Sequence, residues 1–183
     1  MKNKTVTDVV AYKITDKIIK SDFKNYFPDR EDTLHVSRFI LSNILPIIII
    51  MIIGISMGNL SNTFYALLGF SLLRMVSGGY HIKNADTCFL VSVVLLVVLG
   101  FTPELPANIL NVIRLISFLI VMVFSPYNIE NNTVVEKNKH VYFKYLSMLF
   151  VLGSFFIVSS VFVVSIFIQS LTLINLTGKE VRD

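Results

Sequence analysis

Long apolar blocks separated by short polar links make up most of the chain. The blocks are Phe39–Met57, Thr63–Val76, Cys88–Phe101, Ala107–Phe124 and Tyr142–Leu176. A helix that crosses a bilayer needs about 20 mostly apolar residues, so the first four blocks each predict one short transmembrane helix. The last block is too long for a single span and predicts two short helices that meet near Ser159–Ser160.

The first 38 residues form the long polar stretch of the chain. Apolar side chains recur within it at helical spacing, at Val6, Val9, Val10, Ile14 and Ile18. This pattern predicts an amphipathic helix that either lies on a membrane surface or packs against the rest of the protein. Pro46, inside the first apolar block, predicts an irregularity in that helix because proline lacks the backbone N–H.

Composition supports a membrane protein. Apolar residues make up 54% of the 183 residues and charged residues 15%, whereas a soluble domain has about 25% charged residues. The sequence therefore predicts an all-α integral membrane protein with about six short transmembrane helices and an N-terminal amphipathic surface helix. The expected segments are a cytoplasmic or interfacial stretch at 1–38, a single transmembrane domain at 39–177 and a short cytoplasmic tail at 178–183.

The distribution of charge predicts the orientation. The formal net charge is +4, and eight of the 16 Lys and Arg residues precede Phe39. Six spans with a cytoplasmic N-terminus place every other basic residue except Arg114 in cytoplasmic segments, in agreement with the positive-inside rule. We therefore expect a multi-pass protein with both termini in the cytoplasm and no nucleic-acid partner. Arg114 is expected to snorkel outward, and Gly54 and Gly58 allow two helices to approach in a homodimer.

Candidate chemistry is concentrated in the link at residues 74–88. It contains the single cysteine, Cys88, and one of the three histidines, His81. One Cys and one His are too few for a closed zinc site, and neither a metal nor a cofactor is predicted. A cysteine with a nearby histidine can instead perform nucleophilic catalysis, in which the imidazole takes the thiol proton and returns it to a leaving group.

The expected geometry suits this chemistry. Cys88 falls in the first turn of a predicted helix, after Asp86 and Thr87, either of which can cap it. Unpaired amides and the helix dipole at that position would stabilise a thiolate and could bind an oxyanion. His81 would lie roughly 10 Å from Cys88 along one unbroken helix, but Gly78–Gly79 allows the chain to turn and bring the imidazole back.

Taken alone, these residues leave several interpretations open. Cys88 can be a small apolar side chain that fills space at the start of a helix, and His81 can be a solvated loop residue. Arg74 can snorkel to lipid headgroups or hold a substrate carboxylate, and Asp86 can cap a helix or orient His81. A peptide exporter or permease, with Arg74 and Arg114 along a path, and a membrane acyltransferase are the alternatives to a peptidase.

The link resembles the accessory gene regulator protein B (AgrB) family, membrane peptidases of Gram-positive quorum sensing. The residues that carry the resemblance are Arg74, Gly78-Gly79-Tyr80-His81 and Cys88, and Gln169–Leu173 also resembles the family's closing segment.

The resemblance implies a multi-pass thiol protease of the cell membrane of a Gram-positive bacterium. It would cleave the C-terminal tail of an AgrD-like propeptide through a Cys88 thioester, with His81 as base, and close a thiolactone or lactone autoinducing peptide. Lys83 would attract the acidic tail of the substrate. Arg74, Gly78, Gly79 and Asp86 would support the site or bind substrate, and a homodimer is implied.

Overall fold

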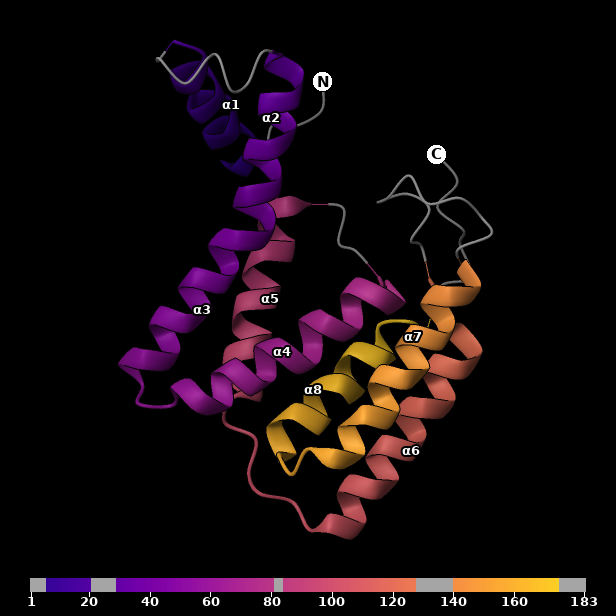
Figure 1. Ribbon diagram of the computed structural model, residues 1–183. Coiled ribbons are helices and arrows are strands. Elements are labelled where there is room, and N and C mark those ends of the chain that lie inside the picture. Colours follow the sequence, from indigo (N-terminus) through magenta and orange to yellow (C-terminus); the bar gives the residue numbers. More distant parts are fainter. Residues whose placement is uncertain (1–5, 21–28, 81–83, 128–139, 175–183) are drawn as a thin grey trace. The chain divides into compact units, whose positions relative to one another are not determined.

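The computed structural model describes residues 6–20, 29–80, 84–127 and 140–174, and these form helices without a strand. The α-helices are α1 Val6–Ile19, α2 Arg30–Phe39, α3 Leu45–Ser56, α4 Leu60–Ser77, α5 Ala85–Leu99, α6 Ala107–Phe124, α7 His140–Gly153 and α8 Ser160–Leu171 (Figure 1). The chain divides into two compact units. The first unit comprises residues 1–53 and 82–95, and the second comprises residues 54–81 and 96–183.

In the first unit, α1 confirms the predicted N-terminal helix but packs through a different face. Ala11 and Thr15 are buried where α1 packs against α2, and the Thr15 hydroxyl donates to Ser37 Oγ over 3.2 Å. Four of the five residues of the predicted stripe remain exposed, namely Val6, Val9, Val10 and Ile14, whereas Ile18 is half-buried. The fully buried side chains of α1 at its contact with α2 are therefore small. The four exposed apolar side chains of α1 remain available to contact another surface.

Helix α2 was not predicted, because its sequence lacks an apolar periodicity. It begins at the N-cap Asp29, whose carboxylate accepts from the Glu31 amide over 3.2 Å. A π-helical segment, Ile40–Ile44, continues α2 into α3. It directly precedes the turn that contains Pro46, so the predicted irregularity takes the form of a widened helical turn.

Among the described residues of the second unit, helices α4, α6, α7 and α8 pack around one apolar core. Helix α8 packs against α4 and α6, and α7 packs against the same two helices (Figure 1). The buried core residues are Leu73, Val121, Val151, Phe162, Ile166 and Leu173. Gly69 allows α4 and α8 to approach closely, because a Cβ at this position would lie 2.7 Å from the Phe162 carbonyl oxygen.

Two boundaries in this unit agree with the sequence patterns. Helix α6 covers Ala107–Phe124, as predicted. The last apolar block is divided as expected: α7 ends at Gly153, a 3₁₀ turn follows at Ser154–Phe156, and α8 begins at Ser160. Ser159 is the N-cap of α8, and its hydroxyl accepts from the Phe162 amide over 3.3 Å.

Arg114 does not snorkel outward as predicted. Its side chain is buried, and it donates to Asn111 Oδ1 and to the Ile157 carbonyl, each over 2.8 Å. The guanidinium also lies 5.3 Å from the centre of the Phe155 ring. Ile157 lies in the break between α7 and α8, so Arg114 satisfies a carbonyl group close to where the helix is interrupted.

The glycine pair proposed for helix association does not form one helix face. Gly54 is in the last turn of α3, where a Cβ would lie 2.9 Å from Thr63 Cβ. Gly58 follows the end of α3 and has a φ of 64°. The space beside Gly54 is thus filled by Thr63 of the same chain, and Gly58 shapes a turn. The pair therefore gives no support to a homodimer.

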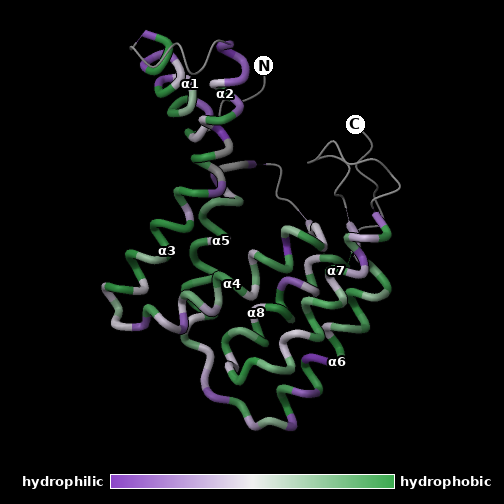
Figure 2. Tube along the Cα trace, viewed as in Figure 1, coloured by the Kyte–Doolittle hydropathy of each residue, from purple (hydrophilic) through white to green (hydrophobic). Residues whose placement is uncertain are grey.

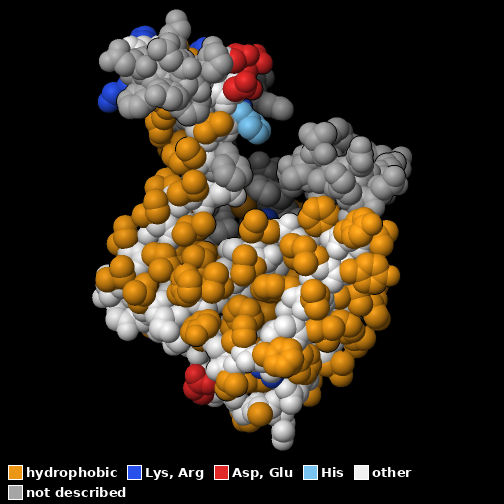
Figure 3. All heavy atoms as spheres, in the orientation of Figure 1, with side chains coloured by type: hydrophobic (Ala, Val, Ile, Leu, Met, Phe, Trp, Pro, Cys, Tyr) orange, Lys and Arg blue, Asp and Glu red, His pale blue; other side chains and the backbone are white. Residues whose placement is uncertain are grey.

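The second unit exposes many apolar side chains. Helices α4, α6, α7 and α8 are largely hydrophobic along their length (Figure 2). Hydrophobic side chains also cover much of the face that Figure 3 shows over α4 and α7. Within the described residues, α6 is the helix both long and apolar enough to cross a membrane, and four further apolar helices are shorter.

Candidate functional site

The predicted site residues are divided between the two units. Arg74, Gly78 and Gly79 belong to the second unit, whereas Asp86 and Cys88 belong to the first. His81 and Lys83 lie outside the described residues. The approach of the His81 imidazole to the Cys88 thiol therefore stays a prediction, and the structure describes the segments on either side of residues 81–83.

The Gly78–Gly79 pair forms a turn that requires glycine. Gly78 is the C-cap of α4, with a φ of 74° and an amide that donates to the Arg74 carbonyl over 3.0 Å. Gly79 has a φ of 136°. Side chains with a Cβ rarely adopt such angles, so this pair stops α4 and redirects the chain toward Tyr80.

The glycine turn is held in place by backbone bonds. The Tyr127 amide donates to the Ser77 carbonyl over 2.9 Å, and the Gly79 amide donates to the Tyr127 carbonyl over 3.2 Å. The Tyr80 amide donates to the Thr172 carbonyl at the end of α8 over 3.0 Å. We call Gly78–Tyr80 the anchored turn. The conformational freedom expected of the two glycines is not observed, because backbone hydrogen bonds fix this segment of the chain.

Two side chains donate further hydrogen bonds to carbonyl groups of the anchored turn. The Gln169 amide nitrogen, Nε2, donates to the Gly78 carbonyl over 2.8 Å. The Arg74 guanidinium donates to the Tyr80 carbonyl over 3.0 Å and lies 5.8 Å from the centre of the Phe70 ring. Arg74 thus has a structural role within the turn, one that neither snorkelling nor substrate binding had suggested.

At the start of α5, Asn84 performs the capping expected of Asp86 or Thr87. Its side-chain oxygen accepts from the Asp86 amide over 3.0 Å and from the Thr87 amide over 3.4 Å. The Cys88 amide donates to the Asn84 carbonyl over 2.9 Å. These three amides are therefore already paired with Asn84, so the expectation that they are unpaired donors is not met.

Asp86 caps a different helix. Its carboxylate accepts from the Val6 amide over 2.7 Å, from the Thr7 amide over 3.1 Å and from the Thr7 hydroxyl. These bonds, the one from the Thr7 hydroxyl first, hold the pKa of Asp86 below its ordinary value because they favour the charged carboxylate. Negative charge at the N-terminus of α1 also complements the helix dipole. Asp86 therefore joins the start of α5 to the start of α1.

Cys88 lies in the first turn of α5, two residues after Asp86. Its thiol is free and half-buried. Among the described residues, no three His, Cys, Asp or Glu side chains gather where they could hold a metal ion. Cys88 thus stands at a helix start that Asn84 and Asp86 hold from two directions.

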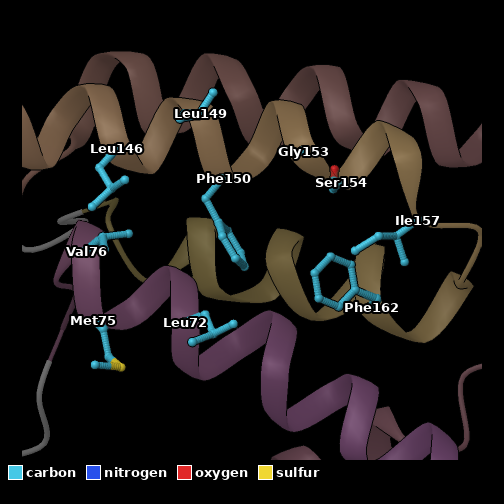
Figure 4. A pocket seen from close by; sticks show the side chains of 10 residues that line it. All are labelled: Leu72, Met75, Val76, Leu146, Leu149, Phe150, Gly153, Ser154, Ile157 and Phe162. Carbon is cyan, nitrogen blue, oxygen red and sulfur yellow. The ribbon is translucent and has the colours of Figure 1, made fainter.

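An apolar groove of about 480 Å³ lies between α4, α7 and α8 in the second unit (Figure 4). Its lining residues are Leu72, Met75, Val76, Leu146, Leu149, Phe150, Gly153, Ser154, Ile157 and Phe162. The Ser154 hydroxyl, the one polar side-chain group in this set, already donates to the Val151 carbonyl over 2.6 Å. The groove can accept apolar groups, and its walls offer no catalytic group.

Fold and site together define a class: an all-helical protein with apolar helix surfaces, a fixed glycine turn and a cysteine at a helix start. The family model described as Accessory gene regulator B matches residues 11–177, and the chain belongs to this family. A similar curated protein is "Putative AgrB-like protein 2" of Clostridium perfringens (strain 13 / Type A). It is 22% identical over 145 residues, which cover 73% of this chain and 65% of that relative. No solved structure matches the chain.

Proposed function

We propose that this protein is a membrane-embedded cysteine endopeptidase that cleaves an AgrD-like quorum-sensing propeptide and cyclises the product. The observation that carries the proposal is the construction of the link between α4 and α5. A fixed turn, Gly78–Tyr80, comes directly before His81, and Cys88 stands half-buried in the first turn of α5. Membership of the AgrB family, which is linked to peptide processing in quorum sensing, supports the same chemistry.

Cys88 is the nucleophile of the proposed reaction and His81 is the general base. His81 takes the thiol proton as Cys88 sulfur attacks the carbonyl carbon at the end of the signal segment. The peptide C–N bond then breaks, and the departing tail amine receives its proton from His81. The product of this half-reaction is a thioester between the peptide and Cys88.

A thiol or hydroxyl within the bound peptide resolves this thioester. Its sulfur or oxygen attacks the thioester carbonyl, its proton passes to His81, and Cys88 leaves as a thiolate that is protonated again. The result is a thiolactone or lactone ring. Holding the attacking group beside the thioester favours ring closure over hydrolysis. The energy of the peptide thioester supports this exchange without ATP.

The surrounding residues support the proposed site in different ways. Lys83 attracts the acidic tail of the propeptide at the cytoplasmic face. Arg74, Gly78 and Gly79 hold the turn that precedes His81. Asp86 holds the helix start that carries Cys88. No cofactor takes part in this chemistry.

The membrane arrangement is part of the proposal. Six short spans place both termini and the link between α4 and α5 in the cytoplasm of a Gram-positive bacterium. Helix α6 is long enough to cross the membrane, and apolar side chains exposed along α3, α5 and α7 support further membrane-embedded segments. Fusions of a topology reporter after Gly58 and after Thr102 test it. Both positions are expected outside the cell, and a cytoplasmic signal at either would overturn six spans.

Purified protein in liposomes, incubated with a propeptide from the same genome, tests the activity. Cys88→Ala is expected to abolish cleavage, and wild-type protein is expected to accumulate a peptide acyl group on Cys88 that hydroxylamine releases. Full cleavage by Cys88→Ala would contradict the peptidase and favour an exporter. A lipid-derived acyl group on Cys88 would instead favour an acyltransferase.

A further inference from the structure

We propose that Gln169 is a positioning residue for His81, acting through the backbone of the anchored turn. The inference rests on the proposed function. Gln169 belongs to α8, 91 residues after the Gly78 carbonyl to which its side chain donates. Tyr80, the last residue of the anchored turn, is covalently joined to His81. Gln169 therefore acts on the backbone three residues before the proposed base.

Gln169 is the side chain that ties the anchored turn to α8. The Ser77 hydroxyl reaches the Gly78 carbonyl over 3.3 Å, and Arg74 reaches the Tyr80 carbonyl, but both residues come from α4 itself. The bonds of the turn with Tyr127 and Thr172 join backbone groups, which tolerate side-chain changes. One substitution at Gln169 thus removes the side-chain bond between the turn and α8, whereas the backbone bond between Tyr80 and Thr172 remains.

The fit around Gln169 leaves the turn little freedom. A Cβ at Gly79 would lie 3.0 Å from Gln169 Nε2 and 2.6 Å from Thr172 Oγ1. Glycine at this position lets the backbone approach α8 closely enough for Gln169 to reach the Gly78 carbonyl. The anchored turn and the end of α8 therefore form one closely packed unit.

The polar amide of Gln169 is not what a side chain that only fills space in the core would carry. The side chain is fully buried, and its Oε1 atom has no hydrogen-bond partner among the described residues. A buried acceptor without a partner is unfavourable, so an apolar side chain of similar length would serve packing better. The amide is explained by its donor, which holds the Gly78 carbonyl.

Loss of this bond is expected to affect proton transfer more than substrate binding. A small displacement of a catalytic group can slow a reaction by about 100-fold. We expect Gln169→Met, which preserves side-chain length without the donor, to lower the kcat of propeptide cleavage by about tenfold or more, with KM nearly unchanged. Ser165→Ala is the matched control, since Ser165 is buried in α8 and its hydroxyl donates within that helix to Val161.

Alkylation of Cys88 by iodoacetamide, measured from pH 5.5 to 9 in liposomes, separates positioning from general damage. If His81 takes the thiol proton, His81→Ala changes the pH profile of alkylation. Gln169→Met is expected to give a profile like that of His81→Ala and to add nothing when the two are combined. A wild-type profile for Gln169→Met, or additive effects in the double variant, would overturn the positioning role. An unchanged profile for His81→Ala would overturn the proposed base, and the inference with it.

Gln169→Glu gives a second variant that keeps the shape of the side chain. A protonated carboxyl group can donate to the Gly78 carbonyl, whereas a carboxylate cannot. The kcat of Gln169→Glu relative to wild type is therefore expected to rise as the pH is lowered. A ratio that stays constant with pH would contradict the role of the Nε2 donor, and it remains measurable even if Gln169→Met fails to fold.

Discussion

The two segments that flank residues 81–83 are stabilised in different ways. The segment before them, Gly78–Tyr80, is held mainly by backbone groups of Tyr127 and Thr172 and by one buried amide. The segment after them, the start of α5, is held by the side chains of Asn84 and Asp86, near the surface. Each segment is also anchored within a different compact unit.

This difference indicates which changes each segment tolerates. Backbone bonds survive most substitutions, so the anchored turn is sensitive to backbone geometry and to the few residues that set it. Side-chain caps are lost when one side chain is replaced. The start of α5 therefore depends on individual polar residues, and the segment before the proposed base and the segment that carries the proposed nucleophile are held by interactions of unlike kinds.

Gly79→Val should have the largest effect, because it attacks the geometry of the anchored turn. A β-branched residue at a φ of 136° is strained, and its Cβ would clash with Thr172 Oγ1. The backbone strain costs about 1–3 kcal/mol, and overpacking costs about 1–3 kcal/mol more. Thermal unfolding in detergent and propeptide cleavage measure the loss, which we expect to include at least about a 100-fold drop in cleavage.

Gly153→Ala is the control for that variant. Gly153 has a φ of −57°, and a Cβ there would meet nothing within 4 Å. We expect unchanged cleavage and unchanged stability. Equal damage from both substitutions would show that the anchored turn has no special sensitivity.

Asn84→Ala should come next, because it removes the cap of α5. Replacing an N-cap residue by alanine costs about 0.5–2 kcal/mol, and the Asp86 and Thr87 amides lose their acceptor. Hydrogen exchange of these two amides should become faster, whereas that of the Gly79 and Tyr80 amides should not change. Asn84→Asp, which keeps the acceptor, should restore slow exchange; failure to do so would contradict the capping role.

Acidification should weaken the bonds between Asp86 and α1. The pKa of Asp86 is lower in the folded protein than its ordinary value of about 3.9, so the unfolded state binds the proton more readily. The stabilisation is fully present above the ordinary pKa and is lost as the pH falls through the lowered, folded-state value. Protection factors of the Val6 and Thr7 amides measure this loss. Asp86→Asn should remove the pH dependence, and a dependence that persists in this variant would assign it to another group.

Tyr127→Phe should have the smallest effect. Tyr127 contributes its backbone amide and carbonyl to the anchored turn, and phenylalanine provides the same groups. We expect a change in unfolding free energy within about 0.5 kcal/mol and unaltered cleavage. A large loss of activity would show that the phenol takes part, and the contrast between the two segments would then be weaker.

Local patterns were sufficient to predict much of the fold. The bounds of α6 follow from a predominantly apolar run between Pro106 and Ser125, since proline and a polar residue mark its ends. The division of the last block follows from its length alone. Helix α2 escaped detection because its stability depends on the Asp29 cap and on contact with α1, neither of which leaves an apolar pattern.

The candidate site was predicted less completely, because its contacts join distant parts of the chain. Asp86 was expected to act on its own helix or on His81, but its partners lie 79 and 80 residues away. Gln169 was noted as part of a family segment, and only its bond to Gly78 gives it a role. The proximity of His81 and Cys88 is still a prediction.

The bonds between Asp86 and α1 have a practical consequence for protein engineering. A truncation that removes the first ten residues would delete Val6 and Thr7, the residues that donate to the Asp86 carboxylate. That carboxylate belongs to the turn that carries Cys88. Trimming the N-terminus to improve expression would therefore alter the surroundings of the proposed nucleophile.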